Sequence, residues 1–120
     1  MKKNLFALSI LTIALTACSD SLKTQAELSE LSYEGFANIV CEAITNSNFE
    51  QLQPISGEKS YKRMKKVSKN KDFSDFVYCS EVTLAEKTKG SKTFTIATFG
   101  GKAKFRIAIT KKDGFYSIIS

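Results

Sequence analysis

The hydrophobic period of the sequence changes near residue 70, from that of helices to that of strands. Before it, residues 26–48 carry an apolar stripe at helical spacing, formed by Tyr33, Phe36, Ala37, Val40 and Ile44. A second, shorter helical pattern covers residues 58–70. From Phe73 onward, apolar and polar residues alternate with a period of two, which is typical of half-buried strands. The order predicts a long N-terminal helix, a short helix and then a sheet.

Two glycine-containing pairs predict how the last strands connect. Gly100-Gly101 and Asp113-Gly114 are both signals for a two-residue hairpin turn. The first turn would place Ile96 opposite Phe105 and Phe94 opposite Ile107. The second would place Ile109 opposite Ile118 and Lys111 opposite Tyr116. Both registers place apolar residues on one common face, so we expect an antiparallel meander.

The first strand, about residues 76–87, has an irregular pattern. Val82 and Leu84 point to one face, whereas Val77 and Cys79 point to the other. A β-bulge near Ser80-Glu81 would bring both pairs to the core face, with a turn following near Lys89-Gly90. The sequence therefore predicts an α+β fold in which a long N-terminal helix and a short helix pack on a four-stranded antiparallel meander sheet.

The N-terminus has the organisation of an export signal. Lys2 and Lys3 precede an apolar run from Leu5 to Leu15, which is too short for a stable membrane span. The run ends in Leu15-Thr16-Ala17-Cys18, which resembles the bacterial lipobox. This resemblance implies that residues 1–17 are a signal peptide and that Cys18 carries the lipid. The alternative is an ordinary secretory signal that happens to precede a cysteine.

The resemblance to Gram-negative lipoproteins also implies a location. Ser19 stands where an aspartate would usually retain such a protein at the inner membrane, so we expect attachment to the outer membrane, facing the periplasm. Residues 18–26 are predicted to be the lipidated cysteine and a short polar tether. Residues 27–120 are predicted to form one domain of ordinary size.

Cys41 and Cys79 are the two cysteines that remain. An even pair in an oxidising compartment predicts a disulfide, and the closed loop of about 39 residues would contribute roughly 4 kcal/mol. The alternative is a pair of buried free thiols. The spacing is far from that of a metal or redox motif.

Phe36-Ala37, Ala43-Ile44 and the step from Asn48 to Leu52 form one distinctive pattern, and the closing strand from Asp113 to Ile118 forms another. With these residues, the arrangement resembles the cystatin-like rolls, and more closely the nuclear transport factor two-like family. The resemblance implies an α+β roll in which one face of the sheet packs on the long helix. The enzymes of this family use pocket Asp, His or Tyr residues that have no match here, so no catalytic residue is carried over.

The composition argues against most catalytic chemistries. The chain has no histidine, which removes the commonest general base and the commonest metal ligand. Asp72, Asp75 and Glu81 are the one acidic cluster, with no nucleophile beside it. We therefore expect no enzymatic activity, no cofactor and no metal.

The charges are divided along the chain. Residues 18–57 hold one base and six acids, whereas residues 58–120 hold fifteen bases and six acids. The short helix is the most basic segment, and its candidate anion-binding or partner-binding residues are Lys59, Lys62, Arg63, Lys65, Lys66 and Lys69. Candidate partners are anionic lipid, lipopolysaccharide or an acidic protein, and nucleic acid is not expected. The alternative is that these bases only solvate the helix.

An apolar cavity between helix and sheet is a second candidate site. It would be lined by Phe36, Val40, Phe94, Ile96, Phe105, Ile107 and Tyr116, although these residues would equally form an ordinary core. The leading interpretation is a membrane-anchored, non-enzymatic binding module that is a monomer or a weak dimer. The alternatives are an inhibitor or immunity-type lipoprotein, directed against a toxin, a phage factor or a host enzyme, and a carrier of a small apolar ligand or lipid.

Overall fold

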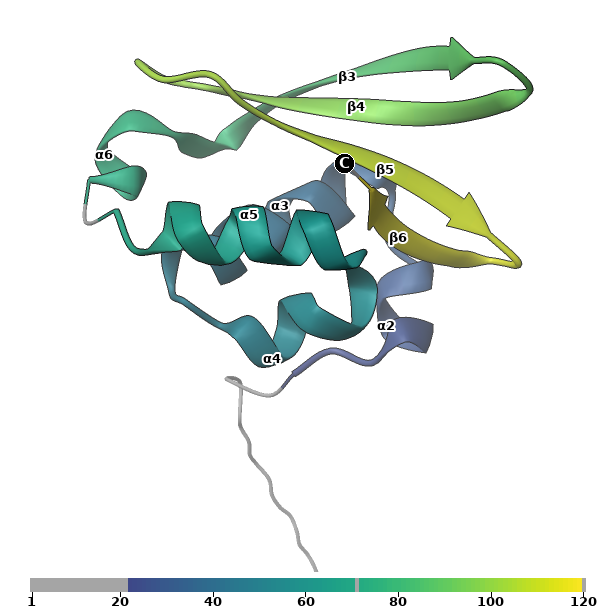
Figure 1. The fold of residues 1–120 in the computed structure, drawn as a ribbon, viewed down its shortest axis with the longest axis horizontal. Helices are drawn as coiled ribbons and strands as arrows, with labels where there is room; N and C mark the ends of the chain where they lie inside the picture. Colours follow the sequence, from purple (N-terminus) through teal and green to yellow (C-terminus); the bar gives the residue numbers. More distant parts are fainter. Residues whose placement is uncertain (1–21, 71, 120) are drawn as a thin grey trace, which may run out of the picture.

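The computed structural model describes residues 22–70 and 72–119, which form a four-stranded sheet with helices packed beneath it (Figure 1). The helical segments come first and are α2 (Gln25–Ser29), α3 (Tyr33–Thr45), α4 (Phe49–Leu52), the 3₁₀ turn η2 (Gln53–Ile55), α5 (Glu58–Ser68) and α6 (Phe73–Phe76). The strands follow as β3 (Tyr78–Lys89), β4 (Lys92–Gly100), β5 (Phe105–Lys112) and β6 (Phe115–Ile119). The predicted α+β class and the antiparallel meander order β3-β4-β5-β6 are confirmed.

The predicted long helix over residues 26–48 is wrong, because two helices occupy that segment. The Thr24 side chain caps α2 by accepting a hydrogen bond from the Glu27 backbone N–H. Ser32 then begins a new helix, since its hydroxyl accepts a hydrogen bond from the Gly35 backbone N–H at 3.0 Å. The predicted apolar stripe does lie on α3, where Phe36 and Val40 are fully buried.

The last hairpin forms as predicted. A turn at Asp113-Gly114 joins β5 to β6, and it places Ile109 opposite Ile118 and Lys111 opposite Tyr116. Asp113 and Gly114 both have positive φ, which a two-residue type I′ turn requires. Local turn chemistry was therefore sufficient to define this register.

The predicted register of β4 against β5 is wrong. Phe99, and not Ile96, lies opposite Phe105, and Ala97 lies opposite Ile107. The reason is that Gly101 does not form a two-residue turn but lies directly against the end of α6. Its φ is +115°, and a Cβ on it would lie 2.2 Å from the Phe76 backbone oxygen. The glycine pair thus permits a close approach to the end of α6, and the connection runs on to Lys104 as a longer loop.

This register change reverses the two faces of β4. Ala97 and Phe99 are fully buried on the core face of the sheet. Phe94 and Ile96, which were predicted to lie in the core, are half-buried on the opposite face. The core itself joins α3, α5 and the near face of the sheet, with Met64 of α5 fully buried.

The irregularity in β3 is confirmed, and so is the disulfide. The pairing of β3 with β4 shifts register between Tyr78 and Val82. Cys79 lies within this shift and is bonded to Cys41 of α3, with a Cα–Cα distance of 5.5 Å. Leu84 does not reach the core as predicted and stays 39% exposed, because β3 and β4 extend past the helices (Figure 1).

The start of the chain is held more closely than the predicted tether implied. The Lys23 backbone N–H donates to the Gln51 side-chain oxygen, and the Gln51 amide donates back to the Lys23 carbonyl at 3.0 Å. The Gln25 side chain also donates to the Pro54 carbonyl. The predicted signal peptide (residues 1–17), Cys18 and the first tether residues lie outside the described residues.

A candidate anion-binding groove beside the basic helix

Helix α5 presents most of its bases on one outer face. With 3.6 residues per turn, Lys59, Lys62, Lys65, Lys66 and Lys69 fall within an arc of about 120°. The opposite face of the helix buries Ser60 and Met64. All five lysines are exposed, and the one ion pair in the described part of the chain joins Lys62 to Glu58 at 3.5 Å. Both side chains of that pair are highly exposed, so it neutralises little of the charge.

Two bases at the edges of this arc contact aromatic rings. The Lys65 ammonium lies 5.4 Å from the centre of the Phe49 ring and 5.8 Å from that of Tyr61. The Arg63 guanidinium lies on the other edge, 5.0 Å from the centre of the Phe105 ring. Five of the six predicted binding residues therefore share the outer face of α5, whereas the Arg63 guanidinium is turned toward the sheet.

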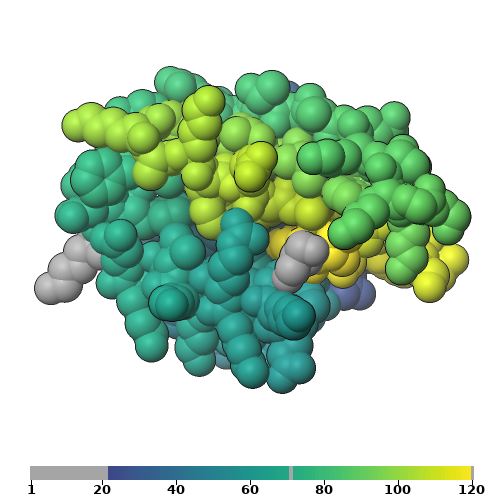
Figure 2. All heavy atoms as spheres, turned by 45° about the horizontal axis from the view of Figure 1, so that its top comes forward, coloured from purple at the N-terminus to yellow at the C-terminus, as the bar shows by residue number. Residues whose placement is uncertain are grey.

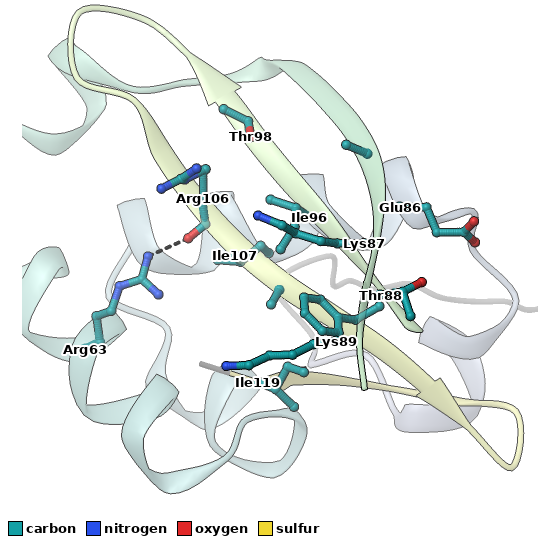
Figure 3. Close-up of a pocket in the computed structure, with 13 residues that line it drawn as sticks. Arg63, Glu86, Lys87, Thr88, Lys89, Ile96, Thr98, Arg106, Ile107 and Ile119 are labelled. Carbon is teal, nitrogen blue, oxygen red and sulfur yellow. Dashed lines mark hydrogen bonds between the residues drawn. The ribbon is translucent and has the colours of Figure 1, made fainter. Parts of the chain in front are cut away.

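Arg63 is one wall of a groove of about 760 Å³ on the face of the sheet opposite the α3 core. Its guanidinium donates a hydrogen bond to the Arg106 backbone carbonyl, which ties α5 to β5 (Figure 3). The α5 end of the sheet is held further by Gly57, whose backbone N–H donates to the Ile118 carbonyl at 3.0 Å. Figure 2 shows this side of the molecule, with the teal side chains of α5 along one border and the green side chains of the β3–β4 hairpin along the other.

The floor of the groove is apolar, and its shape follows from the strand register. Ile96 at its centre is flanked by two small residues, Ala85 on β3 and Ala108 on β5. Phe94 and Ile119 also line the groove. Since these two alanines stand beside larger apolar residues, the sheet surface is hollowed on both sides of Ile96.

The rim of the groove is basic. Arg63, Lys87, Lys89 and Arg106 all line it, and Figure 3 shows Lys87 and Lys89 reaching from β3 toward the α5 side. Glu86 is the one acid among the lining residues, and its side chain points away from the other labelled side chains. Within residues 22–70 and 72–119, none of the four cations forms an ion pair with an acid. A groove with unneutralised cations around an apolar floor is suited to an anion that carries an apolar part.

The predicted helix–sheet site is divided between two places. Phe36, Val40, Phe105, Ile107 and Tyr116 do lie between helix and sheet, but they are packed as core. For example, the Phe36 and Tyr116 rings stack with centres 4.5 Å apart. The other two predicted residues, Phe94 and Ile96, line the groove on the far face. Sequence reasoning missed the groove because Ala85, Lys87, Arg106 and Ala108 meet only through strand pairing.

The titratable groups with a shifted pKa lie outside the groove. Burial raises the pKa of Tyr116, and the neighbouring Tyr33 adds to this effect. The Tyr116 hydroxyl donates a hydrogen bond to the Leu31 carbonyl at 2.6 Å. The hydrogen bond from the Thr24 backbone N–H lowers the pKa of Glu27. Both groups therefore serve the structure of the α2–α3 region.

In the part of the chain that the structure describes, no group of three His, Cys, Asp or Glu side chains is placed to hold a metal ion. The same part contains no helix that is long and apolar enough to cross a membrane. Comparison of the chain with known protein families, with curated proteins and with solved structures finds no match.

Proposed function

We propose that this protein is a non-enzymatic binding module, anchored through Cys18 to the outer membrane and facing the periplasm, which docks its basic face on an anionic surface. The N-terminal pattern of two lysines, an apolar run and Leu15-Thr16-Ala17-Cys18 supports the anchor. The helices packed across one face of an antiparallel sheet are compatible with the cystatin-like or nuclear transport factor two-like roll that the sequence resembles.

The observation that carries this proposal is the exposed lysine row on α5. Lys59, Lys62, Lys66 and Lys69 run along the outer face over about 15 Å. A base near an anionic membrane contributes about 1 kcal/mol, so four bases acting together would contribute about 4 kcal/mol. Most of the acids of residues 18–57 lie on α2, at its C-cap and on α3, namely Glu27, Glu30, Glu34 and Glu42, so the two signs of charge would orient the molecule at such a surface.

The attachment point supports the same orientation. Because Lys23 is hydrogen-bonded to Gln51 of α4, the domain begins beside α4, and α5 follows shortly after it in the chain. From Cys18 to Lys23 the chain spans at most roughly 18 Å when extended. A lipid at Cys18 would therefore keep the α4 and α5 side of the domain close to the membrane.

The anchor is tested by metabolic labelling with palmitate. We expect label on the wild-type protein and none on the Cys18→Ser variant. Label on both proteins, or on neither, would contradict the anchor.

Docking is tested by co-sedimentation with vesicles of anionic and of neutral lipid. The variant changes Lys59, Lys62, Lys66 and Lys69 to Gln. A matched control carries the same change of charge at Lys92, Lys102, Lys104 and Lys112, which are exposed on the sheet and its loops. We expect loss of anionic-vesicle binding in the α5 variant and retention in the control. Equal losses would mean that only net charge matters.

An inhibitor or immunity-type role is the second candidate, and the edge of the sheet favours it. Strand β3 is an edge strand of twelve residues, most of them exposed, and such an edge can pair with a strand of another protein. A Thr83→Pro variant that loses capture of an envelope or toxin protein, while the α5 variant keeps it, would support this role over membrane docking.

A further inference from the structure

We infer that the groove between Arg63 and the sheet binds one single-chain anionic lipid, with its phosphate or carboxylate at the arginine end and its acyl chain along the apolar floor. This inference deepens the proposed function and rests on it, since the membrane on which α5 docks would supply the lipid. It assigns a different set of residues from the outer lysine row.

The cations define the sign of the ligand. Arg63 and Arg106 come from different elements, α5 and β5, and both line one end of the groove (Figure 3). Lys87 and Lys89 reach into the same space from β3. Like charges gathered in this way repel one another, and no acid among the described residues relieves them by an ion pair. An anionic group would remove that repulsion and accept charge-assisted hydrogen bonds from the guanidinium groups.

The floor defines the apolar part of the ligand. Phe94, Ile96 and Ile119 are half-buried and line the groove. They lie on the face of the sheet opposite the α3 core. An acyl chain laid across them would remove their remaining apolar surface from water, at about 25 cal/mol per Å². Ala85 and Ala108 leave the depth for the chain beside Ile96.

The size of the groove favours a single chain. If a methylene is taken as similar in size to a water molecule, about 30 Å³, a chain of sixteen carbons occupies about 500 Å³. The groove of about 760 Å³ then has room for this chain and a small head group along its floor.

An acidic peptide fits the groove less well. A bound peptide must satisfy its backbone N–H and C=O groups, and it usually does so by pairing with the free edge of a strand. The centre of the floor, at Ile96 and Ala108, lies on β4 and β5, and both of these strands are paired on both sides. The free edge of β3 points away from β4 in the plane of the sheet, and not into the groove on its face. An acyl chain has no such groups to satisfy, so the closed backbone of the floor is no disadvantage to it.

Tryptophan fluorescence offers a direct test, because the chain contains no tryptophan. The Phe94→Trp variant is made in the mature chain from residue 18, with Cys18→Ser to remove the lipid. It is titrated with a monoacyl phosphate that is brominated on its chain, below its critical micelle concentration. The reference titrant is the uncharged brominated monoacylglycerol. The control protein is Phe115→Trp, since Phe115 is 44% exposed and does not line the groove.

We expect saturable quenching of the Phe94→Trp protein by the phosphate and little quenching of the Phe115→Trp protein. Adding Arg106→Gln should weaken binding by about tenfold or more, the effect of losing a hydrogen bond to a charged group. Adding Ile96→Asp should abolish saturation. Thermal melts of both variants show whether they remain folded, and a variant that unfolds is replaced by Arg63→Gln or Ile96→Thr.

The inference is overturned by unsaturable quenching, by equal quenching at both tryptophan positions, or by equal affinity for the charged and uncharged titrants. The α5 lysine variant separates it from the proposed function, because that variant should lose vesicle binding and keep the saturable quenching. If vesicle docking survives but no quenching is seen, the groove ligand is wrong and the docking face is right. Quenching without docking gives the reverse conclusion.

Discussion

Two phenylalanines on β4 provide a matched test of which face of the sheet is the core. The perturbation is Phe99→Ala compared with Phe94→Ala, so that the same atoms are removed from the same strand. Phe99 is 0% exposed and packs against Phe105, with ring centres 6.1 Å apart. Phe94 is half-buried on the groove face. If the register of β4 were the one that the glycine pair predicts, the two residues would exchange environments.

The expected magnitudes follow from this burial. Loss of a fully buried phenylalanine side chain costs about 3–5 kcal/mol, because a cavity is left behind. Complete burial of such a side chain is worth about 1.5–3 kcal/mol by transfer, so a half-buried one should cost no more than about 1.5 kcal/mol. In a domain of this size each kcal/mol changes Tm by about 4–8 °C.

The assay is urea unfolding of both variants, followed by circular dichroism and analysed for midpoint and slope. If Phe99→Ala does not fold, Phe99→Leu replaces it, with an expected loss of about 2 kcal/mol from three fewer carbon atoms. Equal losses for the two positions, or a larger loss at Phe94, would refute the register and with it the groove.

Three further predictions concern stability. Replacing Cys41 and Cys79 together with Ala should cost about 4 kcal/mol in urea unfolding, since the bond closes a loop with a sequence separation of 38 residues; a loss below about 1 kcal/mol would contradict it. Burial raises the pKa of Tyr116 above its ordinary value of 10.0, so its contribution is complete below pH 10 and declines as the pH rises through that raised pKa. The free energy of unfolding, measured from pH 9 to 11, should therefore fall less steeply in the Tyr116→Phe variant than in the wild type, and identical slopes would disprove this. Gly101→Ala should destabilise by about 1–3 kcal/mol in a thermal melt, because of the positive φ and the close Phe76 carbonyl; an unchanged melt would exclude this strain.

The parts of the fold that were predictable from sequence are those set by neighbouring residues. The Asp113-Gly114 turn defines its own hairpin, and the apolar stripe of α3 follows from helical spacing. The break between α2 and α3 was missed because it depends on capping by Ser32, inside a pattern that otherwise continues.

The register of β4 could not be derived from its own pattern. Both of its faces are apolar, with Phe94 and Ile96 on one and Ala97 and Phe99 on the other, so alternation alone does not choose between them. The choice is made by the contact of Gly101 with the end of α6, which is a feature of the tertiary structure.

The candidate site was also predictable only where it depends on neighbouring residues. The lysines of α5 stand together in the sequence, and the structure places most of them together on one face. The groove combines a helix with residues from separate strands, and no local pattern brings Arg63, Ala85 and Arg106 together.

Paramagnetic relaxation measured by NMR would show whether the basic face of α5 meets the membrane. The isotope-labelled protein would be bound to anionic nanodiscs that contain a gadolinium-chelating lipid. We expect the strongest broadening at Lys59, Lys62, Lys66 and Lys69, and the weakest on α3, which carries acids and no bases. Broadening that is uniform, or strongest on α3, would show that α5 is not the docking face.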